Sequence, residues 1–399
     1  MSPSPAIEFC LGTPVRPDRL TARERQETGL GESWMANDTS RRQAIEVTKA
    51  TSLKPRPADD ALQFGTVFTD HMFLLDYVEG KGWHRPRIVP YQSFALDPAA
   101  ATLHYAQAVF DGLKAFRGKD GTVRLFRPRT HAERLNRSCA RLCIPEIDPA
   151  LVLRSFHALV GLDEAWVPRK RGTSIYLRPT VIATEAFLGV RPARTYMYFL
   201  ILSPVGSYYA EGMSPVKILV TDKYVRAVQG GLGGAKTAGN YAASLYAAEE
   251  AKKQGYTQVL WLDGVHRKYL DEVGTMNIMV KIGEEVITPP LSGTILAGVT
   301  RDSVLTLLRD WGMKVSERQI AIDEVLAAQR AGTLGEMWGT GTAAVVSPVG
   351  ELGYKGERVT INGGKTGPLT QKLYDTIVGI QYGESNDPHG WTQPISPEA

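Results

Sequence analysis

Apolar residues along this chain fall into short runs separated by turn residues, and the runs differ in length and composition. Runs rich in β-branched and aromatic residues and bounded by turn signals predict strands, and they cover residues 175–184, 196–202, 216–221, 257–262 and 276–281. Longer segments rich in helix formers predict helices at residues 130–142, 242–253 and 300–311. The pattern therefore predicts a mixed α/β fold.

Changes of composition along the chain predict its domains. Residues 1–57 are dominated by Pro, Arg, Glu and Ser without apolar periodicity, which predicts a poorly ordered N-terminal extension in which Met35 is an alternative start. A small α/β domain is expected over 58–205, and a connector over 206–215, within the stretch SPVGSYYAEGMSP. A large domain with a polar C-terminal tail is expected over 216–399.

Composition and charge exclude several classes of protein. The 399 residues are 43% hydrophobic and 22% charged, as is typical of a globular enzyme-sized chain. The net charge of +4 is not gathered into one block, so nucleic acid is not implied. Apolar runs are strand-length, and the N-terminus lacks signal architecture, so no membrane span is expected. Three cysteines predict no disulfide framework, which favours a reducing, cytoplasmic location. We predict no metal site.

The segment GGLGGAKTAGNY, residues 230–241, surrounds Lys236 with glycines and suggests three readings. A nucleotide-binding P-loop needs a glycine before the lysine, where this chain has Ala235, and a helix that begins at the lysine. Residues 237–240, TAGN, look like a poor first helical turn. Lys236 would otherwise be a solvated loop lysine, or an amine that captures an aldehyde.

A lysine amine that captures an aldehyde needs a lowered pKa, and the glycines around it would let a flat ligand approach the backbone closely. If the ligand is pyridoxal phosphate, it also needs a carboxylate at its ring nitrogen, a donor at its ring oxygen and a dianion site. Glu272 and Tyr241 are candidates for the first two. The helix start at residues 298–300 and the run GTGT at 339–342 are candidates for the third.

A cation for the dianion site is expected on the helix THAERLNRSCARL, where Thr130 and Glu133 predict a capping box. Arg134, Arg137 and Arg141 share one face of this helix. Spacing alone does not choose among them, because a solvated arginine row is the ordinary outcome.

Taken together and in order, the motifs resemble the branched-chain aminotransferases, pyridoxal-phosphate enzymes of fold type IV. They are FGTVFTDHM, LHYAQAVFDGLKAFRG, YLRPTVIATEAFLGV, SPVGSYY, GGAKTAGNYAASL, QVLWLDG, EVGTMN, LAGVTRDSVL and GTGTAA. The resemblance runs from about Phe64 to Pro348 and implies a two-domain α/β enzyme of aminotransferase class IV. It also implies a homodimer.

The resemblance implies a role for each matching residue. Lys236 would form a Schiff base with the cofactor and act as general base and acid. The other cofactor residues would be Arg134 and Thr342 at the phosphate with Val299 and Thr300, Glu272 at the pyridine nitrogen and Tyr241 at the ring oxygen. The substrate residues implied are Phe64, Tyr105, Phe110, Tyr176, Arg178, Leu188, Val190, Tyr208, Thr275 and Ala343.

Within this set, Arg178 would hold the far carboxylate of glutamate, and Tyr176 with the 342–343 turn the α-carboxylate. Tyr105, Leu188 and Val190 would act across the dimer interface. Without the resemblance, the aromatic residues would be assigned to a core. A Cys-x-x-Cys redox pair of animal members is replaced here by Ala344 and Ser347, so thiol regulation at that place is not expected.

The activity implied is reversible amino transfer between L-leucine, L-isoleucine or L-valine and 2-oxoglutarate, with L-glutamate and the 2-oxo acids as the other partners. Within the fold, a D-amino-acid aminotransferase or an aminodeoxychorismate lyase is the alternative. From other classes, a nucleotide-binding protein and a non-catalytic binding relative remain as alternatives.

Overall fold

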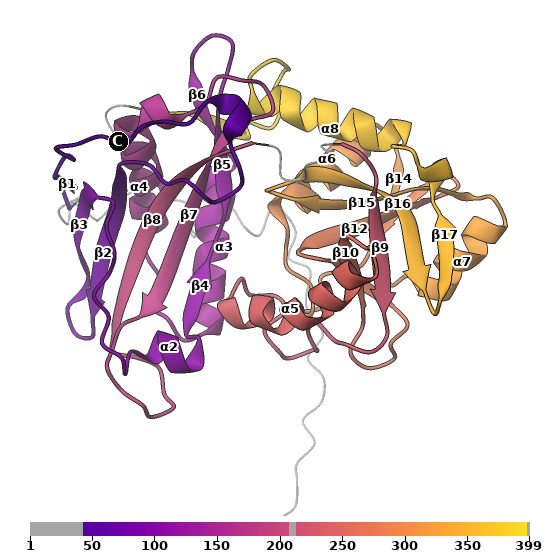
Figure 1. Cartoon of the computed structure of the whole chain (residues 1–399), viewed down its shortest axis with the longest axis horizontal. Coiled ribbons are helices and arrows are strands. Elements are labelled where there is room, and N and C mark those ends of the chain that lie inside the picture. The colour runs from indigo at the N-terminus through magenta and orange to yellow at the C-terminus, as the bar shows by residue number, and fades with distance from the viewer. Residues whose placement is uncertain (1–42, 207–212, 397–399) are drawn as a thin grey trace, which may run out of the picture. The chain divides into compact units, whose positions relative to one another are not determined.

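The computed structural model describes residues 43–206 and 213–396, and its strands form two nine-stranded sheets. Figure 1 shows most of the first sheet in indigo to magenta and the second sheet in red to yellow, with β18 of the first sheet at the yellow end of the chain. Residues 45–399 form one compact unit that contains both sheets. No helix in the described ranges is long and apolar enough to cross a membrane. The expectation of a mixed α/β fold is confirmed.

The first sheet has the order β1-β3-β2-β8-β7-β5-β6-β18, and β4 pairs with β7. Buried and half-buried residues alternate along much of β7 and β8, as expected for strands with one face on a core. The strands are β1 (Glu46–Val47), β2 (His71–Val78), β3 (Gly82–Pro90), β4 (Ala108–Phe110), β5 (Leu113–Arg117), β6 (Val123–Phe126), β7 (Ser174–Ala183), β8 (Thr195–Val205) and β18 (Thr392–Pro394).

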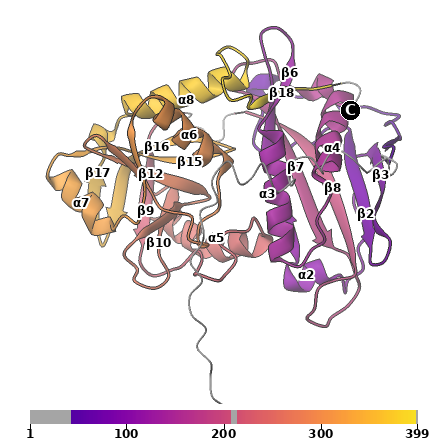
Figure 2. The same cartoon turned by 180° about the vertical axis from the view of Figure 1, so that it is seen from behind.

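Helices α3 (Pro128–Arg141) and α4 (Pro149–Leu162) cover one face of this sheet, and α2 (Ala101–Tyr105) lies at its end (Figures 1 and 2). The buried apolar residues of α3, α4 and the strands between them form one core cluster. The predicted capping box is wrong, because α3 begins at Pro128 and Arg127 is its N-cap residue. Proline at the first helical position already has the φ that a helix needs.

The second sheet has the order β11-β10-β9-β16-β15-β12-β13-β14, and β17 pairs with β16. An additional pairing of β11 with β12 closes six of these strands into a ring around a separate apolar core. The strands are β9 (Val216–Thr221), β10 (Gln258–Leu262), β11 (Leu270–Val273), β12 (Met276–Ile282), β13 (Glu285–Thr288), β14 (Lys314–Glu317), β15 (Leu334–Gly341), β16 (Val345–Tyr354) and β17 (Glu357–Thr360).

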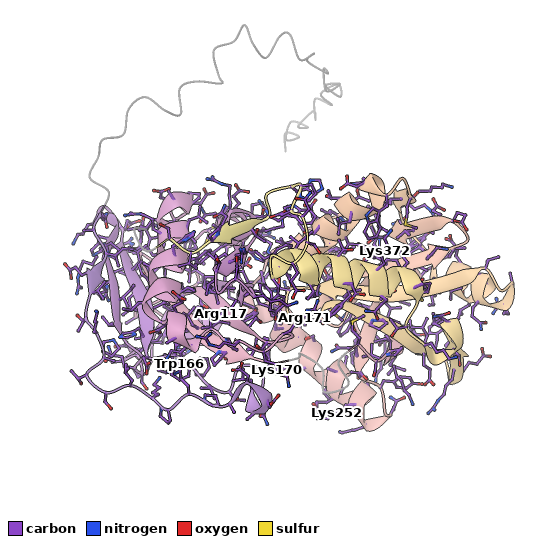
Figure 3. All side chains as sticks on the ribbon, turned by 90° about the horizontal axis from the view of Figure 1, so that it is seen from above. Arg117, Trp166, Lys170, Arg171, Lys252 and Lys372 are labelled. Carbon is purple, nitrogen blue, oxygen red and sulfur yellow. The ribbon has the colours of Figure 1, made fainter. Side chains whose placement is uncertain are left out.

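Four helices accompany this sheet: α5 (Ala238–Lys253), α6 (Val299–Asp310), α7 (Ile322–Arg330) and α8 (Pro368–Gln381). Helix α8 contacts β15 and β16 of the second sheet and β6 of the first. Lys372 of α8 places its ammonium 3.8 Å from the ring of Trp311, and Arg171 lies at the other end of the helix, paired with Glu384 (Figure 3). Helix α8 therefore ties the two sheets together.

The division into domains stays a prediction, and two observations bear on its edges. Residues 46–47, assigned to the extension, pair with β3, and the backbone N–H of Lys54 donates to Asp70. At the other end, β18 of the predicted C-terminal tail pairs with β6 of the first sheet. Both ends of the described chain therefore add strands to the first sheet.

Candidate active site

A cavity of about 230 Å³ lies where the two sheets face each other. Its wall combines side chains of β7, the glycine loop, the start of α6 and the turn between β15 and β16. The residues that line it are Phe64, Phe110, Gly112, Arg134, Tyr176, Arg178, Lys236, Tyr241, Thr275, Met276, Asn277, Leu296, Gly298, Val299, Thr300, Thr340, Gly341, Thr342, Ala343 and Ala344.

The backbone of Lys236 is fixed from two sides. Its N–H donates to Ser138 Oγ of α3 at 2.9 Å, and its carbonyl accepts the N–H of Phe110 at 3.0 Å. Asn240 donates to the carbonyls of Leu232 and Ala235, which anchors the glycine loop on the first turn of α5. The sequence interpretation of residues 237–240 was wrong, since α5 begins at Ala238.

The amine of Lys236 lies against Tyr241, with Nζ donating to the phenol oxygen at 2.6 Å. Burial, and next the positive charge of Arg134, lower the pKa of Lys236 to about 8. Burial raises the pKa of Tyr241 to about 12, so this phenol keeps its proton. A neutral fraction of Lys236 is therefore present near neutral pH, as a nucleophilic amine requires.

Glu272 lies in β11, only 2% exposed, behind the wall formed by Asn277 and Leu296. Its Oε2 accepts from Arg226 Nε at 2.8 Å, and its Oε1 accepts from the Leu296 N–H at 2.8 Å and from Asn277 Nδ2 at 3.3 Å. Burial holds the pKa of Glu272 above its usual range, and the Arg226 charge opposes this effect without reversing it. The side chain of Arg226 is 8% exposed, so the two form a buried ion pair.

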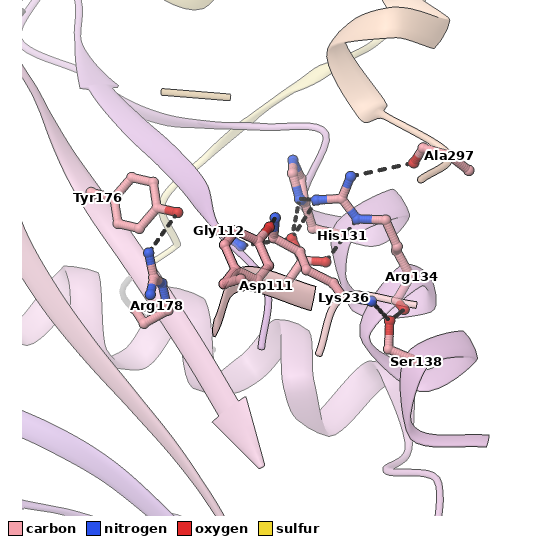
Figure 4. A network of polar contacts seen from close by, with 10 residues as sticks. Asp111, Gly112, His131, Arg134, Ser138, Tyr176, Arg178, Lys236 and Ala297 are labelled. Carbon is pink, nitrogen blue, oxygen red and sulfur yellow. Dashed lines mark hydrogen bonds and ion pairs between the residues drawn. The ribbon is translucent and has the colours of Figure 1, made fainter. Parts of the chain in front are cut away.

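Arg134 is the arginine of its row that faces the cavity, whereas Arg137 and Arg141 are exposed. It is bound in a fork by Asp111, with Nε and Nη2 donating at 2.8 and 2.7 Å, and Nη1 donates to Ala297 O at 3.3 Å (Figure 4). His131 Nδ1 lies 2.7 Å from the same carboxylate. Burial alone would raise the pKa of Asp111, but Arg134 and His131 hold it well below its usual range.

The start of α6 supplies a second group of donors to this end of the cavity. Gly298 is the N-cap, followed by Val299 and Thr300 in the first turn. Only glycine fits at 298, because a Cβ there would lie 2.0 Å from Asn277 Oδ1. Thr340 Oγ1 is buried without a hydrogen-bond partner in the described residues. An arginine, a helix N-terminus and a spare hydroxyl together fit a bound dianion.

The opposite end of the cavity combines aromatic rings with one cation. Arg178 Nη2 donates to Tyr176 Oη at 3.2 Å, and its guanidinium lies 4.8 Å from the ring centre of Phe110 (Figure 4). Arg178 Nε is buried and lacks a partner within the described chain. Phe64 packs edge-on against Tyr176 at 5.0 Å. This end therefore suits an apolar group beside a carboxylate.

Some of the predicted substrate residues lie elsewhere. Tyr105 donates through its hydroxyl to Leu188 O, and Tyr105, Leu188 and Val190 are 43%, 60% and 87% exposed. None of the three lines the cavity that contains Lys236. Tyr208 lies outside the described residues. Phe64, Phe110, Tyr176, Arg178, Thr275 and Ala343 do line the cavity, as do Arg134, Tyr241, Val299, Thr300 and Thr342.

Sequence reasoning missed Asp111, Gly112 and Arg226. Asp111 and Gly112 interrupt the otherwise apolar run AVFDGL, and an acid in such a run is a signal of a buried charge with a partner. A Cβ on Gly112 would lie 1.7 Å from Tyr176 Oη. Arg226 stands alone in the loop after β9, so no local pattern indicates its pairing with Glu272.

Comparison with known proteins gives the family. Residues 108–352 match the family model of amino-transferase class IV. The chain is 56% identical over 355 residues to branched-chain-amino-acid aminotransferase 2 of Bacillus subtilis (strain 168), covering 89% of this chain and 98% of that protein. Branched-chain-amino-acid transaminase 1 of the same strain is 54% identical, covering 88% and 99%.

Solved structures agree in fold. The branched-chain amino acid aminotransferase of Escherichia coli matches with a TM-score of 0.68 at 23% identity, over 81% of this chain and 99% of that one. That of Thermobaculum terrenum, solved in its holo form with pyridoxal phosphate, matches with a TM-score of 0.65 at 23% identity, over 81% and 98%. Class IV aminotransferases use pyridoxal phosphate. The chain is thus a member of the class IV aminotransferases and, within them, of the branched-chain-amino-acid aminotransferases.

Proposed function

We propose that this protein transfers the amino group of L-leucine, L-isoleucine or L-valine reversibly to 2-oxoglutarate, with pyridoxal phosphate held in the cavity around Lys236. The observation that carries the proposal is the amine of Lys236, 2.6 Å from the Tyr241 hydroxyl and with a pKa lowered to about 8. A solvated loop lysine would have neither property.

The donors of the cavity fit this cofactor. Arg134, the first-turn N–H groups at Val299 and Thr300, and the hydroxyls of Thr340 and Thr342 would hold the phosphate. Tyr241 would contact the ring oxygen, and Glu272, paired with Arg226, would hold the pyridine nitrogen. When bound, the cofactor supplies an aldehyde and an electron-withdrawing ring.

Within this arrangement Lys236 has two tasks. Its neutral amine would hold the cofactor, and the freed Nζ would take the proton from the substrate α-carbon and later return it. A pKa near 8 suits both tasks, since the group must gain and lose a proton near neutral pH. Tyr241, with its pKa raised to about 12, would remain a hydrogen-bond partner of Nζ rather than compete for the proton.

The substrate would lie at the aromatic end of the cavity. An aliphatic side chain would pack among Phe64, Phe110 and Thr275, and the far carboxylate of glutamate would pair with Arg178, whose Nε is free to donate. Tyr176 and the backbone N–H groups of Thr342 and Ala343 would hold the α-carboxylate. One apolar cavity with one arginine would thereby accept both leucine and glutamate.

We propose further that the protein is a cytoplasmic homodimer, in which Tyr105, Leu188 and Val190 of one subunit close the cavity of the other. Their exposure in the single chain supports this, because exposed apolar residues that cluster mark an interface. Sedimentation velocity on the purified protein tests the dimer, and a monomer at micromolar concentration would contradict it.

The central experiment replaces Lys236 by alanine. The purified wild type should be yellow and should transaminate L-leucine with 2-oxoglutarate, and Lys236→Ala should lose this turnover while retaining part of its cofactor. Borohydride reduction and peptide mapping should label Lys236 in the wild type. Lys253→Ala, at the exposed end of α5, is the control and should stay active.

Two outcomes would contradict the proposal. Residual transamination by Lys236→Ala would remove the role of this amine. Turnover of D-alanine in place of L-leucine would favour the D-amino-acid aminotransferase alternative.

A further inference from the structure

Lys114 is a buried lysine that the proposed function does not use. It lies in β5 and is 7% exposed. In the antiparallel pairing of β5 with β7, Lys114 stands opposite Tyr176. Directly opposed residues of an antiparallel pair project to the same face. Lys114 and Tyr176 therefore project from the same face of the first sheet.

The ammonium of Lys114 reaches across to the second sheet. Its Nζ donates to the carbonyl of Ala343 at 2.7 Å. Among the described residues it forms no ion pair, and burial lowers its pKa to about 8. A cation buried without a counter-ion is costly, so the hydrogen bond to the Ala343 carbonyl is the polar contact that offsets the burial of this ammonium.

The Ala343 carbonyl belongs to the turn that closes the cavity containing Lys236. Ala343 and Ala344 line that cavity and also a second one of about 90 Å³, whose wall includes Lys114 itself. The turn therefore separates the two cavities, and Lys114 binds it from the side of the smaller one.

The hydrogen bond from Lys114 to the Ala343 carbonyl also orients the next peptide N–H of the turn. In a trans peptide unit the C=O of one residue and the N–H of the next point in opposite directions. Because the Ala343 oxygen is bound to Lys114, the N–H of Ala344 points away from Lys114. In the part of the chain that is described, the N–H groups of Thr342, Ala343 and Ala344 donate to no protein acceptor.

We propose that Lys114 is a positioning residue for carboxylate recognition: by holding the Ala343 carbonyl, it directs the Ala344 N–H and fixes the 342–344 turn, whose free N–H groups would meet the substrate carboxylate. The inference rests on the proposed function and deepens it. The ligand class is a carboxylate bound beside an apolar chain, and Lys114 acts through the turn without touching the reacting atoms.

The test measures binding of an unreactive acid by the cofactor-loaded enzyme. 4-Methylvaleric acid has the carbon chain of leucine without its amine, and calorimetry gives its Kd apart from any turnover. Lys114→Met removes both the charge and the donor at similar length. We expect Kd for this acid and KM for L-leucine and 2-oxoglutarate to rise about tenfold, as for a lost charge-assisted hydrogen bond, with smaller changes in kcat and in cofactor content.

Two further variants complete the test. Lys114→Arg keeps a cationic donor and should restore Kd to within about threefold of wild type, which a merely space-filling role would not require. Lys372→Met, on the exposed face of α8, is the matched control and should bind the acid normally.

Normal binding of 4-methylvaleric acid by Lys114→Met overturns the inference, as does a loss of kcat with Kd unchanged. If Lys114→Met does not fold, Lys114→Gln replaces it, and Kd for 4-methylvaleric acid and kcat are measured on that variant in the same way. A wild type that fails to transaminate L-leucine contradicts the proposed function instead, so the two failures are told apart.

Discussion

At the scale of single residues, the site depends on close approaches that leave no room for added atoms. Gly112 lies directly beside Tyr176, and Gly298 lies beside Asn277. In both places the glycine is required for space, since neither residue has a left-handed backbone. Each glycine thus lets a strand or helix approach the cavity closely enough for a polar side chain to face the ligand.

Gly112→Ala should therefore displace the Tyr176 ring, because the new Cβ would lie 1.7 Å from its hydroxyl oxygen. A displaced Tyr176 hydroxyl would no longer reach the substrate α-carboxylate, and the loss of a hydrogen bond to a charged group should raise KM for L-leucine about tenfold or more. Steady-state kinetics measure it. Gly239→Ala is the control, because a Cβ at 239 meets nothing within 4 Å. Equal KM values for the two variants would show that Tyr176 has no part in substrate binding.

At this scale, the sequence predicted the site residues that belong to recognisable motifs. It placed Lys236, Tyr241, Arg134 and Arg178 in one site, and the structure brings these four to one cavity. It did not find Arg226 or Asp111, because their importance arises from buried charges that meet only after folding.

At the scale of elements, the loop of residues 291–297 joins the two charged centres of the site. The N–H of Leu296 binds Glu272, and the carbonyl of Ala297 binds Arg134. Arg226 binds both Glu272 and this loop, since its Nε pairs with Glu272 and its Nη1 donates to Thr294 O at 2.8 Å. Loss of Arg226 would therefore release this loop and leave a carboxylate unpaired.

Arg226→Met should lower the free energy of unfolding by about 3–5 kcal/mol, the usual cost of leaving one partner of a buried pair alone. Urea unfolding followed by circular dichroism measures the change. Arg194→Met breaks an exposed pair with Glu79 and should cost less than about 1 kcal/mol. If Arg226→Met lowers the free energy of unfolding by no more than Arg194→Met does, the pair with Glu272 is not shielded from water, which contradicts the prediction.

Predictions of elements succeeded where local preference and tertiary context agree. Strand β9 has the predicted bounds, 216–221, and β7, β8, β10 and β12 differ from prediction by a few residues at most. Helix α5 begins four residues earlier than predicted, at Ala238, although Gly239 and Asn240 are weak helix formers. The side chain of Asn240 binds two carbonyls of the glycine loop, so contacts outside the helix offset a poor local preference.

At the scale of the whole molecule, the network of Asp111, His131 and Arg134 links the first sheet, α3 and the loop before α6 in a place without solvent. The pKa of Asp111 is held low, so the folded state keeps this carboxylate ionised where the unfolded chain would take up a proton. Such a group stabilises the fold above its unfolded pKa of about 3.9 and loses that contribution as pH falls. Burial lowers the pKa of His131, which adds a loss of stability as pH falls below about 6.5.

Asp111→Asn should lower the free energy of unfolding by about 3–5 kcal/mol at pH 7, because Arg134 is left charged and buried. The difference from wild type should begin to shrink as pH falls below about 4, near the unfolded pKa, and should go on shrinking at lower pH, because the folded pKa lies well below this value. Urea unfolding at a series of pH values measures both effects. Asp60→Asn, an exposed partner of Lys170, is the control and should change little at any pH. A constant difference across this pH range would contradict the assigned charge state of Asp111.

The fold class, most elements and the family could be predicted from the sequence, because periodicity, turn residues and ordered motifs are local properties of the chain. The sequence also marked Lys236 as the candidate chemical centre, since a lysine among glycines is visible without any structure. The folded structure was needed to show how Glu272 and Arg134 are paired with opposite charges and that Lys114 crosses to Ala343. These depend on burial and on contacts between residues that belong to different elements of the chain, and no local pattern carries that information.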